Sequence, residues 1–180
     1  MKTVDSLGLG TYQFWVNGAI DALGANDKML SGYPGVVFAV FSYPTDYSLD
    51  GHDEIDMEFS HWGTHSTNAD YNVWPKEGSD PPNTVNNFNL NLDGAWTTLR
   101  YARGANDVWF NIYGDHVAPA CNPVSYKYWD YNGDDISTTK MPVHINLFNF
   151  TDPPDDMNEI EVVINKFTFI PAGHSLGACP

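Results

Sequence analysis

The sequence predicts an all-β fold in which two antiparallel sheets pack face to face as a sandwich. Short runs of aromatic and β-branched residues alternate with turn clusters along the chain, and this pattern is typical of strands joined by loops. No apolar repeat of helical period persists over a long window, so long helices are not expected. The 180 residues suffice for one core, and neither an internal repeat nor a linker divides them, so residues 1–180 are expected to form a single domain.

The expected strands follow one another with short connections. In chain order they are 10–16, 35–43, 53–60, 71–74, 88–92, 96–103, 108–113, 143–150 and 159–170. The segment 35–43 is almost continuously apolar, which predicts a strand buried on both faces. Residues 104–107 supply the turn of a hairpin between two of these strands. Residues 78–84 and 151–158 are expected to be loops, and residues 118–140 contain few periodic signals.

The charge of the chain excludes some classes of partner. Twenty-three acidic residues against eight basic ones give a formal net charge of −15. This charge repels phosphate backbones, so no nucleic acid is expected as a partner, whereas a neutral glycan would be indifferent to it. Six Trp and ten Tyr residues exceed what an ordinary core needs, and such residues often line sites for sugar rings. No apolar run is long enough for a membrane helix.

The cysteines and histidines give weaker signals. Cys121 and Cys179 are either one disulfide or two free thiols, and the sequence does not decide between them. His61 and His65 have the four-residue spacing of a helical zinc site, but the intervening Trp-Gly-Thr disfavours a helix. No metal-ligating residues are therefore assigned from the sequence.

Three acidic residues alternate with three apolar ones in the segment 54–59, Glu-Ile-Asp-Met-Glu-Phe. Because successive side chains of a strand point to opposite faces, Glu54, Asp56 and Glu58 share one face and the apolar residues share the other. Like charges on one face repel each other, and burial of a carboxylate costs more still. A solvated strand face is one explanation of the pattern, and a chemical role is the other.

Retaining hydrolysis of a glycosidic bond needs such a group of acids. It requires two carboxyls ~5–5.5 Å apart, one ionised as nucleophile and one protonated as acid. Glu54 and Glu58 are four residues apart, so their Cβ atoms would stand ~13 Å apart on an extended strand. Two long side chains that lean inward on a concave sheet could close most of this gap. Asp56 lies between them, where its charge and hydrogen bonds would separate their pKa values.

The segment 54–59 resembles the catalytic signature of glycoside hydrolase family 16, in its lichenase/laminarinase-like β-glucanases. The extra residue that some members carry before the second Glu is absent here, as in lichenases and xyloglucan enzymes. Four flanking segments resemble family strands in the family's order: 8–14, 34–43, 99–114 and 141–149. The resemblance implies a concanavalin A-like jelly roll, a β-sandwich of two antiparallel sheets with a concave substrate cleft.

The resemblance also implies roles for individual residues. Glu54 would be the nucleophile, Asp56 the assisting acid and Glu58 the general acid/base. Expected sugar-binding residues, by match to cleft positions of the family or by substitution at them, are Phe41, Tyr43, Asn72, Trp74, Asn146, Phe148, Gln13, Trp15 and His52. For Phe41 and Phe148 a place in the core is the alternative.

The chain also departs from the family pattern. Gln13 and Trp15 replace a charged Glu–Arg pair, His52 replaces a Trp, and Phe148 replaces another, so the substrate is less certain than the reaction. Only seven residues precede Gly8, so the domain is expected to lack the family's usual N-terminal segment, as a naturally minimal domain, a fragment or a permuted form. An absent strand would leave an edge or a gap that something must cover. No cofactor is required. A structural Ca²⁺, common in the family, would fall near Asn165, which is a weak ligand type.

The sequence therefore predicts a retaining endo-β-glucanase that hydrolyses 1,3- or mixed 1,3-1,4-β-glucan by double displacement. A transglycosylase acting on a β-glucan or xyloglucan is the first alternative, and a non-catalytic carbohydrate-binding or lectin-like module is the second. The expected partner is a neutral β-linked polysaccharide, and the expected state is a monomer that binds no membrane. The expected location is extracellular, although no signal segment follows the first three residues.

Overall fold

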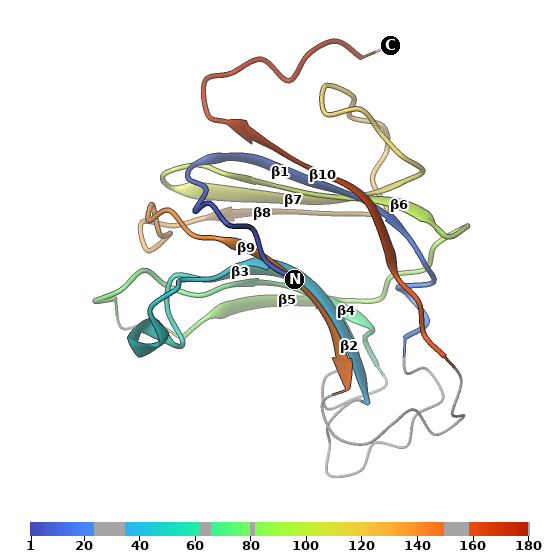
Figure 1. Ribbon diagram of the computed structural model, residues 1–180, viewed down its shortest axis with the longest axis horizontal. Coiled ribbons are helices and arrows are strands. Elements are labelled where there is room, and N and C mark those ends of the chain that lie inside the picture. The colour runs from blue at the N-terminus through green and yellow to red at the C-terminus, as the bar shows by residue number, and fades with distance from the viewer. Residues whose placement is uncertain (24–34, 62–65, 80–81, 150–158, 180) are drawn as a thin grey trace.

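The fold is a sandwich of two antiparallel sheets, as the sequence predicts. The computed structural model describes residues 1–180 except 24–34, 62–65, 80–81, 150–158 and 180. Its ten described strands form two five-stranded sheets, which Figure 1 shows as two stacked layers. A short 3₁₀ helix, Tyr47–Leu49, accompanies them. None of the helices in the described ranges is long and apolar enough to span a membrane.

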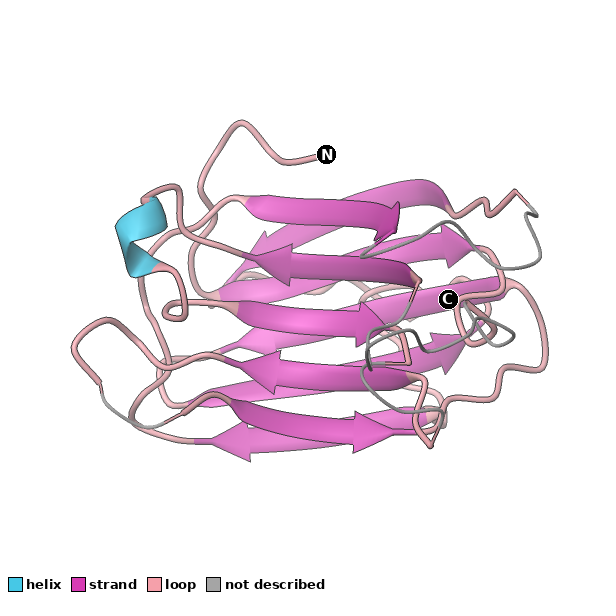
Figure 2. Ribbon diagram, turned by 90° about the horizontal axis from the view of Figure 1, so that it is seen from below, coloured by secondary structure: helices cyan, strands magenta, loops and turns pink. Residues whose placement is uncertain are grey.

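The lower layer in Figure 1, here named the front sheet, carries the acidic segment. Its strand order is β5 (Thr84–Phe88), β4 (Ala69–Val73), β3 (Ile55–Phe59), β2 (Val36–Ser42) and β9 (Val143–Asn149). Figure 2 views the molecule from the side of this sheet, with its strands running across the picture. At one end β2 and β9 curve away from the other layer (Figure 1), so the outer face of the front sheet is concave.

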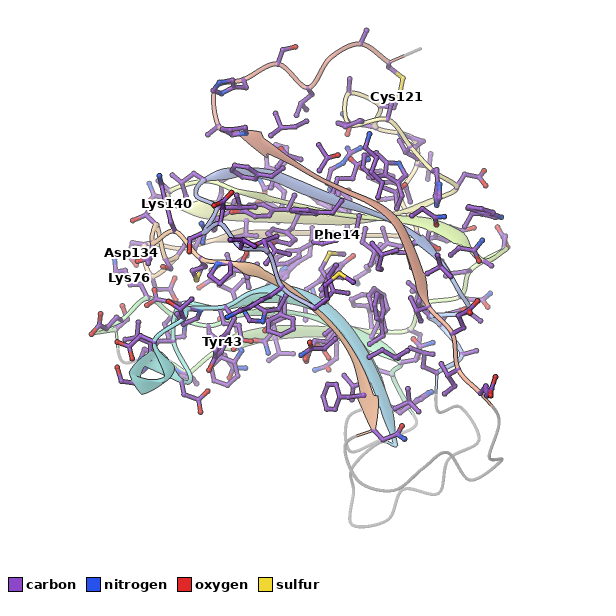
Figure 3. The ribbon with its side chains drawn as sticks, in the orientation of Figure 1. Phe14, Tyr43, Lys76, Cys121, Asp134 and Lys140 are labelled. Carbon is purple, nitrogen blue, oxygen red and sulfur yellow. A yellow bond between two sulfur atoms is a disulfide. The ribbon has the colours of Figure 1, made fainter. Side chains whose placement is uncertain are left out.

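The upper layer, here named the back sheet, supplies the other half of the core. Its strand order is β10 (Val163–Pro171), β1 (Gly10–Asn17), β6 (Trp96–Arg103), β7 (Asp107–Gly114) and β8 (Lys127–Asn132). Alternating residues of both sheets fill the space between them. Phe14 of β1 is fully buried there (Figure 3), and Tyr71 of β4 stacks on Phe110 of β7 with ring centroids 4.7 Å apart.

Two strands differ from the expected ones. The fifth strand, β5, begins at Thr84 and ends at Phe88. The prediction of a strand at 88–92 was therefore wrong, and so was the prediction that the preceding loop includes residue 84. Strand β8, within the segment that gave few periodic signals, was not predicted. Both strands lie at an edge of a sheet. Edge strands are half solvated and keep polar residues, so their apolar alternation is weak in the sequence.

The first residues of the chain cover the open edge of β9. Lys2 and Leu7 form isolated bridges with His144 and Met141, and the backbone N–H of Thr3 donates to the carbonyl of Val143 at 2.8 Å. An uncovered strand edge invites pairing with another chain. The edge that the sequence left open is therefore partly paired by the chain itself.

The outer face of the back sheet is covered by the loop 116–122. Arg100 is 5% exposed, and its guanidinium donates to the carbonyls of Ala118 and Cys121 and to the side chain of Asn122. Cys121 and Cys179 form a disulfide with a Cα–Cα distance of 4.9 Å, near the top of Figure 3. Of the two alternatives for the cysteines, the structure therefore contains the disulfide.

Candidate active site

The acidic residues project from the outer, concave face of the front sheet. Ile55, Met57 and Phe59 are buried in the core, so Asp56 and Glu58 point the other way. Directly paired residues of antiparallel strands share a face. One row across the sheet is therefore Val85, Asn72, Asp56, Phe41 and His144, and the next row is Asn87, Asp70, Glu58, Ala39 and Asn146.

A cavity of about 390 Å³ lies over these rows. Its described lining is Glu54, Asp56, Glu58, Asp70, Asn72, Trp74, Val85 and Asn87. Four of these eight residues are carboxylic acids, and none of the described lining residues is a Lys, Arg or His. The three acids that the sequence assigned to catalysis therefore share one pocket, together with a fourth acid and an indole ring.

A kink in the backbone places Glu54 at the entrance of β3. The preceding residue, Asp53, is a buried non-glycine residue with a positive φ of 58°, a conformation that Asp tolerates better than most residues. The N–H of Asp53 donates to the carbonyl of Pro75, and the N–H of Trp74 donates to the carbonyl of Glu54. These two bonds tie the start of β3 to the end of β4, so Glu54 and Trp74 lie beside each other at the cavity.

Asp56 and Glu54 form a hydrogen-bonded pair of carboxyls. Two ionised carboxylates only accept hydrogen bonds, so one member of such a pair must carry a proton. Burial raises the pKa of Asp56 well above its ordinary value, and the neighbouring carboxyls Glu54 and Glu58 raise it further. Burial also raises the pKa of Glu54 and the hydrogen bond from Asp56 lowers it, with a net pKa of about 8. The bond also raises the pKa of the more deeply buried Asp56, so Glu54 loses its proton first and then accepts the bond as a carboxylate while Asp56 keeps its proton.

The indole of Trp74 fixes the other side of Asp56. Its Nε1 donates to Asp56 Oδ2 at 3.2 Å, so the aspartate is held by an N–H donor from the end of β4 as well as by the Glu54 carboxyl. The carboxyls thus differ in protonation through burial and hydrogen bonding. This is the division of roles that a nucleophile and its assisting acid require.

The raised pKa values predict that the protein loses stability as the pH rises. Glu54 and Asp70 both have folded-state pKa values of about 8, above the ordinary values of 4.5 for Glu and 3.8 for Asp. Between about pH 4 and pH 8 the folded chain therefore binds more protons than the unfolded chain, so the free energy of unfolding falls across this window. Urea denaturation at a series of pH values measures the slope.

A matched pair of variants separates this effect from general charge repulsion. Glu54→Gln and Asp115→Asn each remove one titratable carboxyl, but Asp115 is an exposed residue just after β7 in the back sheet. We expect Glu54→Gln to flatten the fall in stability by at least about 1 kcal/mol over the window and Asp115→Asn to leave it nearly unchanged. Equal slopes in the two variants would contradict the assignment.

The front sheet also carries most of the other expected sugar-binding residues. Asn72 and Trp74 line the cavity, and the amide of Asn83 holds the Asn72 side chain by a 2.9 Å hydrogen bond. Phe41 stacks on His144 and meets Tyr43 edge-on, outside the cavity lining.

Two further expected sugar-binding residues, Asn146 and Phe148, lie on β9. By register, Asn146 and Phe148 of β9 lie on the face that carries the carboxyls, and Phe148 is 40% exposed. A core position for Phe148 is therefore excluded. Tyr43 lies on the same outer side of the sheet (Figure 3) and donates to Asp50 at 2.9 Å.

The expectation that Gln13 and Trp15 line the cleft is wrong. Both belong to β1 of the back sheet and lie on its outer face, since Tyr12 and Phe14 point into the core. Both side chains donate to the carbonyl of Val117, and Gln13 also accepts from Arg100. Alternation along β1 indicated which residues share a face, but not to which sheet the strand belongs. His52 lies outside the described cavity lining, next to the kink at Asp53.

Three described residues of the lining were not predicted: Asp70, Val85 and Asn87. A signal for Asp70 does exist in the sequence. In the segment 69–74, Ala-Asp-Tyr-Asn-Val-Trp, the residues Asp70, Asn72 and Trp74 alternate with buried ones, as the acids do in 54–59. Val85 and Asn87 of β5 had no such signal, because residues 85–87 were assigned to no strand in the sequence.

Metal ligands are not grouped in the described part of the chain. No set of three or more His, Cys, Asp or Glu side chains among the described residues could hold a metal ion. Asn165 is the extra residue of a bulge opposite Trp15 and Val16, and its side chain is exposed. Calcium also binds backbone carbonyls, so the calcium expectation stays a prediction. His65 lies outside the described residues.

Comparison with known proteins identifies the fold. No protein-family model matches the sequence, and no curated protein matches it. A Bacillus licheniformis β-glucanase superposes with a TM-score of 0.52 at 20% identity, covering 82% of this chain and 56% of that one. The fold is that of the family 16 glycoside hydrolases.

Two further structures share this GH16-like fold. A prokaryotic β-1,3-1,4-glucanase (lichenase) from a mouse hindgut metagenome gives a TM-score of 0.54 at 13% identity, covering 94% of this chain and 70% of that one. The Crh5 transglycosylase in complex with NAG gives 0.53 at 14% identity, covering 93% and 66%. This chain spans little more than half of the Bacillus structure. The fold that the sequence resemblance implied is therefore confirmed.

Proposed function

We propose that this protein is a retaining endo-β-glucanase that hydrolyses 1,3- or mixed 1,3-1,4-β-glucan. The observation that carries the proposal is the arrangement of the carboxyl groups at the start of β3 and along it. Glu54, Asp56 and Glu58 line one cavity on a concave sheet face, and Asp56 is hydrogen-bonded to both Glu54 and Trp74. Two glutamates flanking a proton-holding aspartate suit double displacement, whereas a surface that only binds sugars does not need them.

The reaction would proceed in two steps. In the first, the Glu54 carboxylate attacks the anomeric carbon while Glu58 gives its proton to the glycosidic oxygen, and the carbon–oxygen bond breaks. In the second, the Glu58 carboxylate takes a proton from water, whose oxygen attacks the same carbon and releases Glu54. Asp56 keeps its proton throughout and hydrogen-bonds to Glu54, which stabilises the carboxylate before attack and as it leaves the sugar.

Aromatic rings on both sides of β3 support cleavage within a polysaccharide chain. Trp74 stands at the end of β4, and Phe41 and Tyr43 stand on and after β2, while the acids lie on β3 between these strands. The apolar faces of pyranose rings stack on such side chains, so sugars can be held on either side of the bond to be cleaved. The acidic lining favours a neutral glycan over a sulfated or uronic one. The disulfide supports an extracellular location.

A set of polysaccharides tests the proposed function. The protein is incubated with lichenan, laminarin, agarose and xyloglucan, and new reducing ends and oligosaccharides are measured. We expect cleavage of lichenan or laminarin, with the β-anomer formed first when proton NMR follows the products. Glu54→Gln and Glu58→Gln are the matched inactive controls, and Asp115→Asn is the active one.

Other outcomes would overturn parts of the proposal. Products longer than the substrate that form only when an acceptor sugar is added would show that the enzyme is a transglycosylase rather than a hydrolase. Binding to a glycan without new reducing ends would indicate a binding module instead. Cleavage that survives both Gln substitutions would exclude the assigned residues.

A further inference from the structure

A fourth carboxyl, Asp70, lies directly beside the proposed acid/base. In the antiparallel pairing of β3 and β4, Asp70 is the Cα partner of Glu58, so both side chains leave the sheet on the same face. Both line the cavity, and Asp70 is only 3% exposed. Asp70 was not among the site residues predicted from the sequence, and the two-glutamate mechanism does not require it.

The contact between Asp70 and Glu58 needs a proton. Their side chains are hydrogen-bonded to each other, and Asp70 Oδ1 has no hydrogen-bond partner among the described residues. Because ionised carboxylates are acceptors only, the bond exists only while one of the two acids is protonated. The repulsion between two carboxylates in contact also opposes ionisation of both members, as in carboxylate dyads of other enzymes.

The described lining of the cavity offers no cation that could replace this proton. The titratable groups that face the pair from the described lining are Asp56 and Glu54, which are also acids. From the neighbouring strands, Asn87 of β5 pairs with Asp70, and Ala39 of β2 pairs with Glu58. Burial, the charge of Glu58 and the hydrogen bond to Glu58 together raise the pKa of Asp70 to about 8.

We propose that Asp70 is a positioning residue that shares one proton with Glu58, so that the pair keeps a proton available for the glycosidic oxygen into alkaline conditions. The proposal rests on the proposed function of the same site. Once Glu54 has ionised, the four carboxyls hold two protons, one between Asp56 and Glu54 and one between Asp70 and Glu58. In the first step the second of these protons passes to the glycosidic oxygen, and in the second step water returns it. Asp70 touches Glu58 rather than the reacting atoms.

The pH profile of Asp70→Asn tests this role. Asn keeps the size of Asp and a hydrogen bond to Glu58 but carries no charge, so Glu58 should lose its proton more easily. We expect the alkaline limb of kcat/KM to move down by about one pH unit or more, with kcat/KM below that limb reduced by less than about tenfold. Asp115→Asn, the same chemical change on the back sheet, should leave the limb in place. An equal loss of kcat/KM at every pH would overturn the proposal, since a structural role predicts that result.

A titration without substrate keeps the test independent of the proposed function. The side-chain carboxyl ¹³C resonances of Glu58 and Asp70 are followed by NMR from acid to alkaline pH. In Asp70→Asn the Glu58 resonance should titrate at lower pH than in the parent protein, and in Glu58→Gln the Asp70 resonance should do the same. If neither resonance moves, the shared proton is excluded even in an active enzyme. If both move in a protein that cleaves no glycan, the proton pair stands and the proposed function fails.

Discussion

Glu54→Ala is expected to lower the rate of glycan cleavage by at least about 10⁴-fold. Glu54 lines the cavity beside Asp56, and the variant leaves no nucleophile to form the glycosyl-enzyme. Azide added with an activated aryl β-glycoside should restore turnover, because the small anion fits the space left by the carboxylate. It attacks directly, so the product should be the α-glycosyl azide, identified by NMR.

Glu58→Ala is the matched variant and should give the opposite stereochemistry. Polysaccharide cleavage should fall by about 10²–10⁴-fold, the usual contribution of general acid–base catalysis. An aryl glycoside whose leaving group needs no proton should still form the glycosyl-enzyme. Azide then attacks the intermediate from the other side, and the product should be the β-glycosyl azide. The same anomer from both variants, or rescue of neither, would contradict the roles given to the two glutamates.

Removal of the disulfide, by Cys121→Ser with Cys179→Ser, is expected to lower the free energy of unfolding by about 4 kcal/mol. The two cysteines are 58 residues apart in the sequence, and closure of a loop of this length restricts the unfolded chain. The disulfide also tethers the loop whose carbonyls accept from Arg100, so the buried guanidinium would lose part of its support. Urea unfolding at constant pH measures the difference.

Reduction of the parent protein provides the control for this prediction. A thiol reductant should lower the midpoint of urea unfolding of the parent protein and leave the double-Ser variant unaffected. Glycan cleavage below the unfolding transition should change little, because the disulfide lies on the far side of the back sheet from the cavity (Figure 3). A loss of less than about 1 kcal/mol in the double variant would show that the chain-entropy effect is offset in the unfolded state.

Several strands were predictable because their signal is local. Residues 96–103 were predicted as a strand and form β6 with the same bounds, and the expected strand 10–16 differs from β1 by one residue. Period-two alternation also indicated that Glu54, Asp56 and Glu58 share a face, and the cavity does bring them together. Alternation is a property of consecutive residues, so a single strand reveals it without knowledge of its neighbours.

Relations between strands were decided only by the tertiary structure. Gln13 and Trp15 were predicted from the sequence to line the cleft. Their strand, β1, instead pairs with β10 and β6 in the back sheet. It did not single out Asp70, whose position beside Glu58 follows from the register of β3 and β4. Strand order and register depend on the packing of the whole core, and one residue of slip would exchange the two faces of a strand. The sequence by itself thus determined that three acids share one face of a strand, and the tertiary structure decided which residues lie beside them.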